Sequence, residues 1–499
     1  MRFYNFFLLS LFLAVSLSSC SQDTESTNVN WKDLENETPE WFKDAKFGIY
    51  FHWGVYTVPA YHSEWYSRSM YFPGSKANEH HLGHYGPLDE FGYKDFVPMF
   101  KAERFDPDAW AELFVKAGAR FAGPVAEHAD GFSMWDSEVN SWNAKDRGPE
   151  IDVVDAMEKA IRQHDLKFIT TFHHQWHWGW YPTHKDPDSV DAADPAYSEL
   201  YGPEVSEAAW RHEDDAARPD EAFSRLWADK VHEVIEGYDP DMIYFDTRMG
   251  HIDEPFREEI VRHFRENNSE RGMKGQGVIL HKFDDLPAEV SVRNHEKSRM
   301  NRLGEQVWQT EEPITTFSWC YTQDMELRPA RDILHSLVDI VSKNGVYLLN
   351  ISPKSDGTIP QDQQDILLSI GQWLDRYGEA VYGTRPWYRY GEGPRYDAET
   401  SEEESDEEYH ELSYTAEDVR YTTKGNTIYA ILLGQPGEKE LQLQAFSQNS
   451  QPVKVTNVHL IGSDETLAWS DSEDGLNVTL PAEVPANMAT VLKIETGDG

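Results

Sequence analysis

The chain of 499 residues is short of cysteine, of basic residues and of long apolar runs. Its two cysteines, Cys20 and Cys320, cannot supply a disulfide framework for the fold. The 45 Lys and Arg residues face 88 Asp and Glu residues, which gives a formal net charge of −43. A surface of that sign repels phosphate backbones, so we expect no nucleic-acid partner. No stretch after residue 20 is long and apolar enough to predict a transmembrane helix.

The N-terminal segment has the pattern of an export signal. Arg2 precedes an apolar run too short to span a bilayer, and Leu17-Ser18-Ser19-Cys20 resembles a bacterial lipoprotein signal, in which the cysteine is lipidated. We expect a lipoprotein-type signal peptide over residues 1–20 and a polar spacer over 21–30. The protein would then be exported and anchored through Cys20 in a bacterial cell envelope. An ordinary signal peptide with an incidental cysteine is the alternative. If Cys20 carries lipid, Cys320 is a lone thiol, which we expect to be buried by packing.

Short β-type runs alternate with amphipathic helical stretches over the central part of the chain. Repeated β-then-α units predict an α/β fold with a parallel sheet, and their number favours a closed, (β/α)8-like barrel of the TIM type over residues 31–388. No glycine-rich phosphate loop follows a strand, which argues against a nucleotide site. The predicted strands are 47–52, 120–126, 167–172, 242–246, 277–281, 306–310 and 346–351, and the predicted helices are 107–117, 153–164, 221–237, 255–267, 330–343 and 361–377.

The pattern changes near residue 389. An acidic stretch at 399–408 predicts a solvated loop. Alternating runs with Gly, Pro, Asn and Asp at their turns follow it, and we expect a small C-terminal antiparallel β-sandwich over residues 389–499. The predicted strands of this domain are 426–433, 440–445, 452–460, 476–480 and 489–494.

Polar residues gather where the first four barrel strands end. His52, His128, His173 and Asp246 end or directly follow these strands, and tryptophans lie close to them in the sequence. Because catalytic groups of a barrel sit at the carboxyl ends of its strands, we expect these side chains to meet in one pocket. Imidazoles and a carboxylate can bind hydroxyl groups while aromatic rings cover the apolar face of a sugar. The pattern therefore predicts a sugar site.

Several motifs recur in a recognisable order. They include Ser63-Glu64-Trp65, Glu127-His128-Ala129-Asp130-Gly131-Phe132 and the segments 41–54, 240–246, 318–321, 338–345, 348–350 and 356–360. In this order they resemble the α-L-fucosidases of glycoside hydrolase family 29, over about residues 31–390. The resemblance implies retaining, exo-acting hydrolysis of terminal α-L-fucosyl residues by a (β/α) barrel, with no cofactor. The expected substrate is a fucosylated glycan or a fucose-containing polysaccharide.

The resemblance also implies two catalytic carboxyl groups. Asp246 matches the family nucleophile, and retaining glycosidases place the second carboxyl about 5–5.5 Å away. A helix N-cap is the structural alternative for Asp246. For the acid/base we choose Glu296, which we expect in a loop after the 277–281 strand that could swing over the leaving group. The rival candidates for this role are Glu305, Glu311 and Glu312.

The expected sugar contacts come from the same resemblance. It places His52, Glu64, Trp65 and His128 on the sugar hydroxyls and Tyr244 beside the nucleophile, whereas His173 is placed mainly by its strand end. Most relatives carry a second histidine where this chain has Ala129. We therefore expect a locally larger pocket, which relaxes recognition of the sugar or admits a sulfate or a branch.

Three alternatives to this interpretation stay open. His173, His174 and His177 have spacing that could suit zinc, but the tryptophans among them favour an aromatic loop, and we expect no metal. A catalytically inactive carbohydrate-binding lipoprotein would keep the pocket without turnover. An α-L-galactosidase-like enzyme would accept a sugar that differs from fucose by one hydroxyl group. If the substrate is a sulfated fucan, the acidic surface predicts a saline environment, where salt screens the repulsion.

Overall fold

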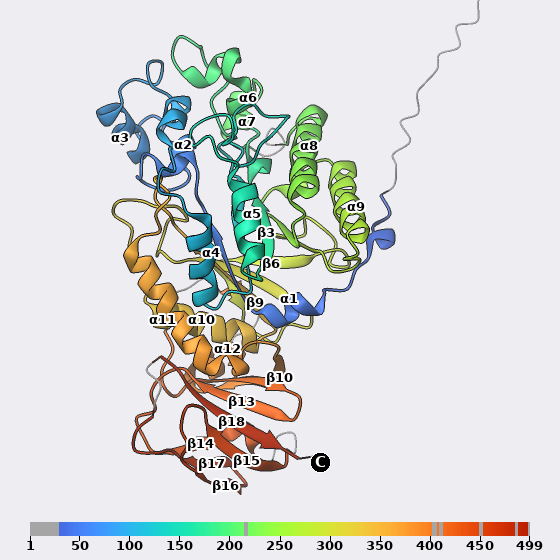
Figure 1. The fold of residues 1–499 in the computed structure, drawn as a ribbon, viewed down its shortest axis with the longest axis vertical. Helices are drawn as coiled ribbons and strands as arrows, with labels where there is room; N and C mark the ends of the chain where they lie inside the picture. The colour runs from blue at the N-terminus through green and yellow to red at the C-terminus, as the bar shows by residue number, and fades with distance from the viewer. Residues whose placement is uncertain are drawn as a thin grey trace, which may run out of the picture.

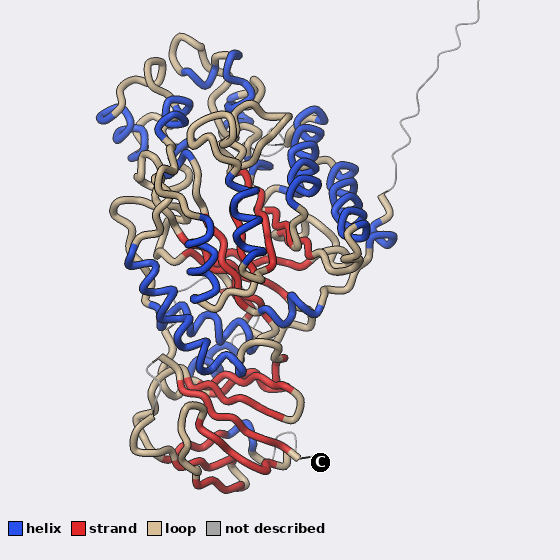
Figure 2. The backbone as a smooth tube through the Cα atoms, viewed as in Figure 1, coloured by secondary structure: helices blue, strands red, loops and turns tan. Residues whose placement is uncertain are grey.

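A closed barrel forms the body of the protein, and antiparallel sheets follow it (Figures 1 and 2). The computed structural model describes residues 29–213, 218–401, 407–408, 413–448, 453–484 and 488–497. The predicted signal peptide, Cys20 and residues 21–28 of the predicted spacer lie outside the described residues, as do residues 402–406 of the acidic stretch. Within the described part of the chain, no helix is long and apolar enough to cross a membrane.

Eight parallel strands close the barrel, which confirms the predicted fold class. One strand was not predicted, because the polar residues 292–296 were assigned to a loop. In barrel order the strands are β1 (Phe47–Phe51), β2 (Phe121–Glu127), β3 (Lys167–Phe172), β4 (Met242–Phe245), β5 (Val278–His281), β6 (Val292–Glu296), β8 (Trp308–Pro313) and β9 (Gly345–Ile351).

Each predicted helix of the barrel begins within one residue of its observed start. Side chains of Asp106, Asp152 and Asp220 accept hydrogen bonds from the first turns of α4, α5 and α8, which fixes these starts. No helix forms in residues 282–291 or 297–307, so a groove of about 880 Å³ lies outside β5, β6 and β8. The helices are α4 (Pro107–Lys116), α5 (Val153–Gln163), α8 (Glu221–Tyr238), α9 (Glu254–Glu270), α10 (Ala330–Ser342) and α11 (Gln361–Tyr377).

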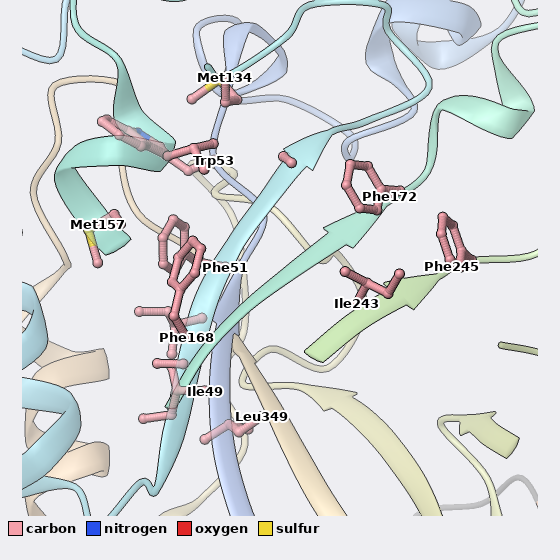
Figure 3. Packing of buried hydrophobic residues seen from close by; sticks show 14 of the residues in the cluster. Ile49, Phe51, Trp53, Met134, Met157, Phe168, Phe172, Ile243, Phe245 and Leu349 are labelled. Atoms are coloured by element: carbon pink, nitrogen blue, oxygen red, sulfur yellow. The ribbon is translucent and has the colours of Figure 1, made fainter. Parts of the chain in front are cut away.

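Alternate residues of each strand face the helices and the barrel interior. Ile49, Phe51 and Ile243 belong to the large apolar core outside the strands (Figure 3). Met242 and Tyr244 belong to a separate cluster inside the barrel. Because the period of a strand is two, the next inward positions on β4, β5 and β6 are taken by polar residues. These residues, at the carboxyl end of the barrel, are Asp246, Lys282 and Glu296.

Two long segments cover the carboxyl ends of the strands. Residues 52–106 contain α2 (Tyr66–Ser69) and α3 (Lys76–His84), and the β3–α8 segment contains α6 (Ser198–Tyr201) and α7 (Glu207–Trp210). These helices lie at the top of Figure 1. The buried Arg68 guanidinium ties the two segments together, since it donates to the carbonyls of Gly179 (2.6 Å) and Trp180 (2.7 Å).

The C-terminal domain is a β-sandwich, as predicted, and lies at the bottom of Figure 1. Side chains of both sheets share one apolar core. The predicted boundary at residue 389 falls inside β10, the first strand of the domain. One sheet has the order β10 (Arg385–Glu392), β12 (Val419–Lys424), β13 (Thr427–Leu432), β18 (Thr490–Thr496) and β15 (Val455–Leu460), and the other has β14 (Glu440–Leu443), β17 (Gly475–Thr479) and β16 (Ala468–Ser472).

A buried ionic cluster joins the barrel to the sandwich. Arg420 of β12 donates to Asp339 of α10 (2.6 Å), and Lys343, one turn further on, also contacts Asp339 (3.0 Å). Glu399 of α12 (Pro394–Ser401) completes the cluster at 3.1 Å from Lys343 and 3.4 Å from Arg420. All four side chains are fully buried. The interface is therefore held by paired charges that water does not reach.

Candidate active site

Asp246 directly follows β4 at the carboxyl end of the barrel. Its N–H donates to the carbonyl of Phe172 on β3 (3.0 Å), and its carbonyl accepts from Gln175 Nε2 (2.7 Å). Its carboxylate is 15% exposed and contacts Lys282 Nζ and His173 Nδ1. The short helix that follows is capped by Arg248, so the helix N-cap alternative for Asp246 is wrong.

Lys282 lies at the centre of the carboxylates. Its ammonium group donates to Asp246, lies 2.8 Å from Glu296 Oε2 and lies 3.0 Å from Glu311 Oε1. One carboxylate oxygen each of Asp246, Glu296 and Glu311 lies within 4.8 Å of the others. Asp246 and Glu296 are therefore close enough to act on one anomeric carbon.

The charges of this cluster set its protonation. Burial raises the pKa of Asp246, but the Lys282 ammonium and His173 outweigh burial and hold that pKa well below its usual range. Burial lowers the pKa of Lys282, but the three carboxylates hold it well above its ordinary value. At neutral pH Asp246 is an anion and Lys282 is a cation.

Glu311 forms the floor of the site inside the barrel. It is 1% exposed, and it accepts hydrogen bonds from the hydroxyls of Tyr50 and Tyr244, each at 2.6 Å. Asn294 Nδ2 donates to the Tyr244 hydroxyl at 3.1 Å. Tyr244 was predicted to lie beside the nucleophile, and the structure places it two residues before Asp246 on β4, fully buried and bonded to Glu311.

Three histidines form one wall of the site, as the strand ends predicted. The ring centroids of His52 and His173 lie 4.9 Å apart, and those of His128 and His173 lie 5.0 Å apart. Burial and the neighbouring imidazoles lower the pKa of His52 and of His128 well below the usual value, so both rings are neutral. His128 Nδ1 and His173 Nε2 are buried and have no hydrogen-bond partner in the structure. These nitrogens can bind the hydroxyl groups of a ligand.

Glu64 and Trp65 lie at the rim of the site. The buried Glu64 carboxylate accepts a hydrogen bond from the N–H of Trp319 (3.1 Å), whose ring lies 5.5 Å from that of His52. Trp65 packs against Trp176 and Trp180, at 5.3 and 4.7 Å between ring centroids. Glu64 thus reaches the histidines of the site through Trp319, and Trp65 belongs to an aromatic group with Trp176 and Trp180.

The four candidates for the acid/base occupy different environments. Glu296 is 40% exposed and shares Lys282 with Asp246, and it ends strand β6 rather than lying in the predicted loop. Glu311 is held at the barrel floor. Glu312 points away from the barrel interior to Arg299 and Arg328, and these cations, against the effect of burial, lower its pKa to about 2. Glu305 precedes β8 and lines the outer groove at the amino end of the strand.

Two sets of side chains in the site could hold a cation. They are the imidazoles of His52, His128 and His173 and the carboxylates around Lys282, where the ammonium group already supplies positive charge. His174 and His177 do not join His173, because their rings contact the carbonyls of Trp227 and Ala129. The three histidines of the zinc alternative, His173, His174 and His177, therefore do not form one group of possible metal ligands in the structure.

Ala129 is packed in the main apolar core and is 1% exposed. The locally larger pocket predicted beside it stays a prediction. Cys320 is likewise 1% exposed, as expected for a packed thiol.

Sequence reasoning missed several residues that contact the carboxylates and histidines of the site. Lys282 directly follows a predicted strand, which is the same signal that identified Asp246. Tyr50 lies two residues before His52 and so faces the same side of β1. Asn350 of β9 accepts from His52 N (3.0 Å) and lies 2.7 Å from His52 Nδ1. Strand alternation could have indicated all three.

Comparison with known proteins gives one consistent family. The alpha-L-fucosidase family model matches residues 14–379, and the model of the alpha-L-fucosidase C-terminal domain matches residues 413–495. The tissue alpha-L-fucosidase of Homo sapiens is 30% identical over 503 residues, which cover 98% of this chain and 96% of that protein. The tissue alpha-L-fucosidase of Bos taurus is 31% identical, covering 96% of this chain and 93% of that protein.

Solved structures agree with the sequence relatives. The structure of Thermotoga maritima alpha-fucosidase in complex with fucose has a TM-score of 0.73 and is 26% identical, and the match covers 93% of this chain and 99% of that chain. The same enzyme in complex with a mechanism based inhibitor has a TM-score of 0.74. The comparisons favour neither a binding protein nor a galactosidase. Because the family model covers well over half of the chain, this protein belongs to the alpha-L-fucosidases of glycoside hydrolase family 29.

Proposed function

We propose that this protein is a retaining exo-α-L-fucosidase, with Asp246 as the nucleophile and Glu296 as the acid/base. The observation that carries the proposal is the pairing of these two carboxylates on one ammonium group, Lys282, at the carboxyl ends of β4 and β6. Two carboxyl groups this close fit direct attack of one of them on the anomeric carbon, with no water molecule between, which is the geometry of retaining glycosidases.

Each group has a distinct part in the two steps. In the first step an Asp246 oxygen forms a bond to the anomeric carbon, the bond to the leaving oxygen breaks, and Glu296 donates its proton to that oxygen. In the second step Glu296 takes a proton from water, the water oxygen bonds to the anomeric carbon, and Asp246 leaves as a carboxylate. The product keeps the α configuration of the substrate.

Lys282 keeps the nucleophile ready. An ionised Asp246 attacks, whereas a protonated one does not, and the Lys282 ammonium stabilises the ionised form. Glu296 is the more exposed of the two carboxyl groups, so it can exchange protons with water between the steps. The different surroundings thus fit two different roles.

The histidine wall fits a terminal sugar residue. The buried His128 Nδ1 and His173 Nε2 have no partner in the structure, and an unpaired buried polar atom costs about 1–3 kcal/mol. Hydroxyl groups of a fucosyl residue would satisfy them. The proposed substrate is therefore a terminal α-L-fucosyl residue of a glycan or polysaccharide fragment.

The proposed roles predict the configuration of azide products. With 4-nitrophenyl α-L-fucoside, Glu296→Ala still forms the fucosyl-enzyme, and azide then attacks to give the α-fucosyl azide. Asp246→Gly cannot form that intermediate, so azide attacks the substrate directly and gives the β-fucosyl azide. NMR determines the anomeric configuration of each azide product and so assigns the two roles. Exchanged configurations, or full activity of either variant, would contradict them. Glu305→Ala is the control and keeps wild-type turnover.

We further propose that the protein is exported and lipid-anchored through Cys20. The sequence Leu17-Ser18-Ser19-Cys20 supports this proposal. Cells expressing the full chain with radiolabelled palmitate should yield labelled protein, and Cys20→Ala should abolish the label. An unlabelled wild-type protein would contradict the anchor, and a secreted but unlabelled one would indicate an ordinary signal peptide.

A further inference from the structure

A second group of histidines and carboxylates lies on the outer face of the barrel, between α8 and α9. These helices stand side by side in Figure 1, and they precede and follow β4, the strand that carries Asp246. Each helix contributes one histidine and one glutamate, four residues apart and therefore on one face. The four residues are His232 and Glu236 on α8 and Glu259 and His263 on α9.

The four side chains pair across the two helices. His232 Nε2 lies 2.8 Å from Glu259 Oε1, and His263 Nε2 lies 3.2 Å from Glu236 Oε1. The two imidazole rings lie against each other with centroids 4.1 Å apart. One ligand atom each of His232, Glu236 and His263 lies within 4.8 Å of the others. Two imidazole nitrogens and one Glu236 oxygen thus come together, and Glu259 lies beside them through its contact with His232.

We propose that His232, Glu236 and His263, completed by Glu259, bind one Zn²⁺ ion or a similar divalent transition metal. Zinc takes imidazole nitrogen and carboxylate oxygen at about 2.0–2.2 Å in a tetrahedron, so neighbouring donors must come to about 3.3 Å. The cluster is already close to that spacing, and its side chains are 20–64% exposed, which leaves them room to close. Because the side chains are partly exposed, an ion can reach them from solvent.

Charge favours the same occupant. The two carboxylates neutralise a divalent cation, while the imidazoles bind it only when they are neutral. His263 Nε2 is buried and lacks a hydrogen bond with good geometry. Arg225 holds Glu259 through two bonds of 2.9 Å and so orients this carboxylate from behind.

The bound ion would link α8 to α9, the helices that precede and follow β4. It is remote from the sugar site, so zinc binding here raises the thermal midpoint of unfolding without being needed for turnover. This property separates the new site from the histidines of the active site, where a bound ion would block the substrate.

The test is metal binding by the full chain after treatment with EDTA. Equilibrium dialysis against ZnCl₂ should give one tightly held ion per chain, and Co²⁺ should give the visible absorption of a tetrahedral nitrogen–oxygen site. In His263→Gln, affinity should fall by more than about tenfold, which is the loss seen even when a group that supports a ligand is removed. His232→Gln should behave in the same way. Hydrolysis of the fucoside by both variants should match that of the wild type.

His164→Gln is the matched control. His164 is 24% exposed and pairs with one carboxylate, Asp108, at 2.8 Å, but it has no second histidine beside it in the structure. This variant should keep the wild-type affinity. Equal zinc binding by wild type and His263→Gln would overturn the proposal, and so would loss of the tight ion in His128→Gln, which would assign it to the active site.

Discussion

Strand β8 carries two adjacent glutamates that belong to two different clusters of buried charge. Glu311 faces the barrel interior and joins Lys282, Asp246 and Glu296. Glu312 faces outward and joins Arg299 and Arg328, which lead on to the cluster at the sandwich. Strand alternation sends the neighbours in opposite directions, so one residue of register separates the proposed catalytic site from the domain interface.

The two clusters differ in charge balance and in access to water. Around Lys282, three carboxylates share one ammonium group, and Glu296 is 40% exposed. At the interface, Asp339 contacts Lys343, Arg420 and Arg299, and Glu399 contacts Lys343, Arg420 and Arg395. Both carboxylates are 0% exposed. The closed cluster, in which each carboxylate has several cations, holds the two domains in place. In the proposed mechanism, the excess negative charge of the open cluster would stabilise the positive charge that develops on the sugar in the transition state.

The interface cluster should respond most strongly to loss of a cation. Arg420→Met leaves Asp339 and Glu399 short of one partner in a site without water, which costs about 3–5 kcal/mol in the free energy of unfolding. Denaturant melts of wild type and variant measure the loss. Because the cluster is far from the sugar, kcat/KM should stay within about twofold of wild type. A large fall in kcat/KM with unchanged stability would break the distinction between the clusters.

The neighbours on β8 give the sharpest contrast. Glu312→Gln removes the anion shared by Arg299 and Arg328 and should lower unfolding stability by roughly 3 kcal/mol. Glu311→Gln loses the charge that binds Lys282 and two tyrosine hydroxyls. The activation free energy should therefore rise by about 2–3 kcal/mol, which lowers kcat/KM by about 30- to 150-fold. Parallel melts and kinetics of the two variants measure both effects. Equal effects of the two variants on both quantities would contradict the separation.

A third buried lysine has no carboxylate of its own. Lys46 is 0% exposed and its Nζ has no hydrogen-bond partner in the structure; burial, and then Arg385, lowers the pKa of this ammonium group from 10.5 to about 7. The folded-state pKa lies below the unfolded one, so stability falls as pH falls from about 10.5 to about 7. Lys46→Met removes this loss, and its gain in stability should be about 3 kcal/mol larger at pH 6 than at pH 9. Equal gains at the two pH values would show that Lys46 is not destabilised by its charge.

Lys282 should control the acidic limb of the pH–activity profile. The Lys282 ammonium holds the pKa of Asp246 low, so Lys282→Met raises that pKa. Asp246 must be ionised to attack, and the acidic limb of kcat/KM should therefore move to higher pH by about one unit or more, which is about 1.4 kcal/mol. Lys282→Arg keeps the positive charge and serves as the control. An acidic limb of kcat/KM at the same pH in wild type and Lys282→Met would show that Lys282 does not set the pKa of Asp246.

Local patterns were enough to predict most of the fold. Helix periodicity predicted α4, α5 and α8 with their observed starts, and apolar runs predicted seven of the barrel strands. Strand β6 escaped prediction because Asn294 and Glu296 face a polar pocket, so its residues lack the apolar alternation of an ordinary strand. The closed barrel supplies the pairing that its own sequence does not signal. In the sandwich, β10, β12 and β16 were also not predicted.

The candidate site was predicted where single strand ends carry the chemistry. His52, His128, His173 and Asp246 follow from that rule, and the structure brings them together. Lys282 and Tyr50 act through partners far away in the sequence, and those contacts depend on the order of strands around the barrel. The choice among the four glutamates likewise needed the direction in which each side chain points.

Covalent trapping of the enzyme tests the central claim, that Asp246 attacks the sugar. The enzyme should be incubated with 2-deoxy-2-fluoro-L-fucosyl fluoride, in which the fluorine slows hydrolysis of the intermediate, then digested and sequenced by mass spectrometry. The account predicts one fucosyl label per chain, on the Asp246 carboxylate, with no label in Asp246→Asn. A label on Glu296 or Glu311, or turnover without a covalent adduct, would contradict it.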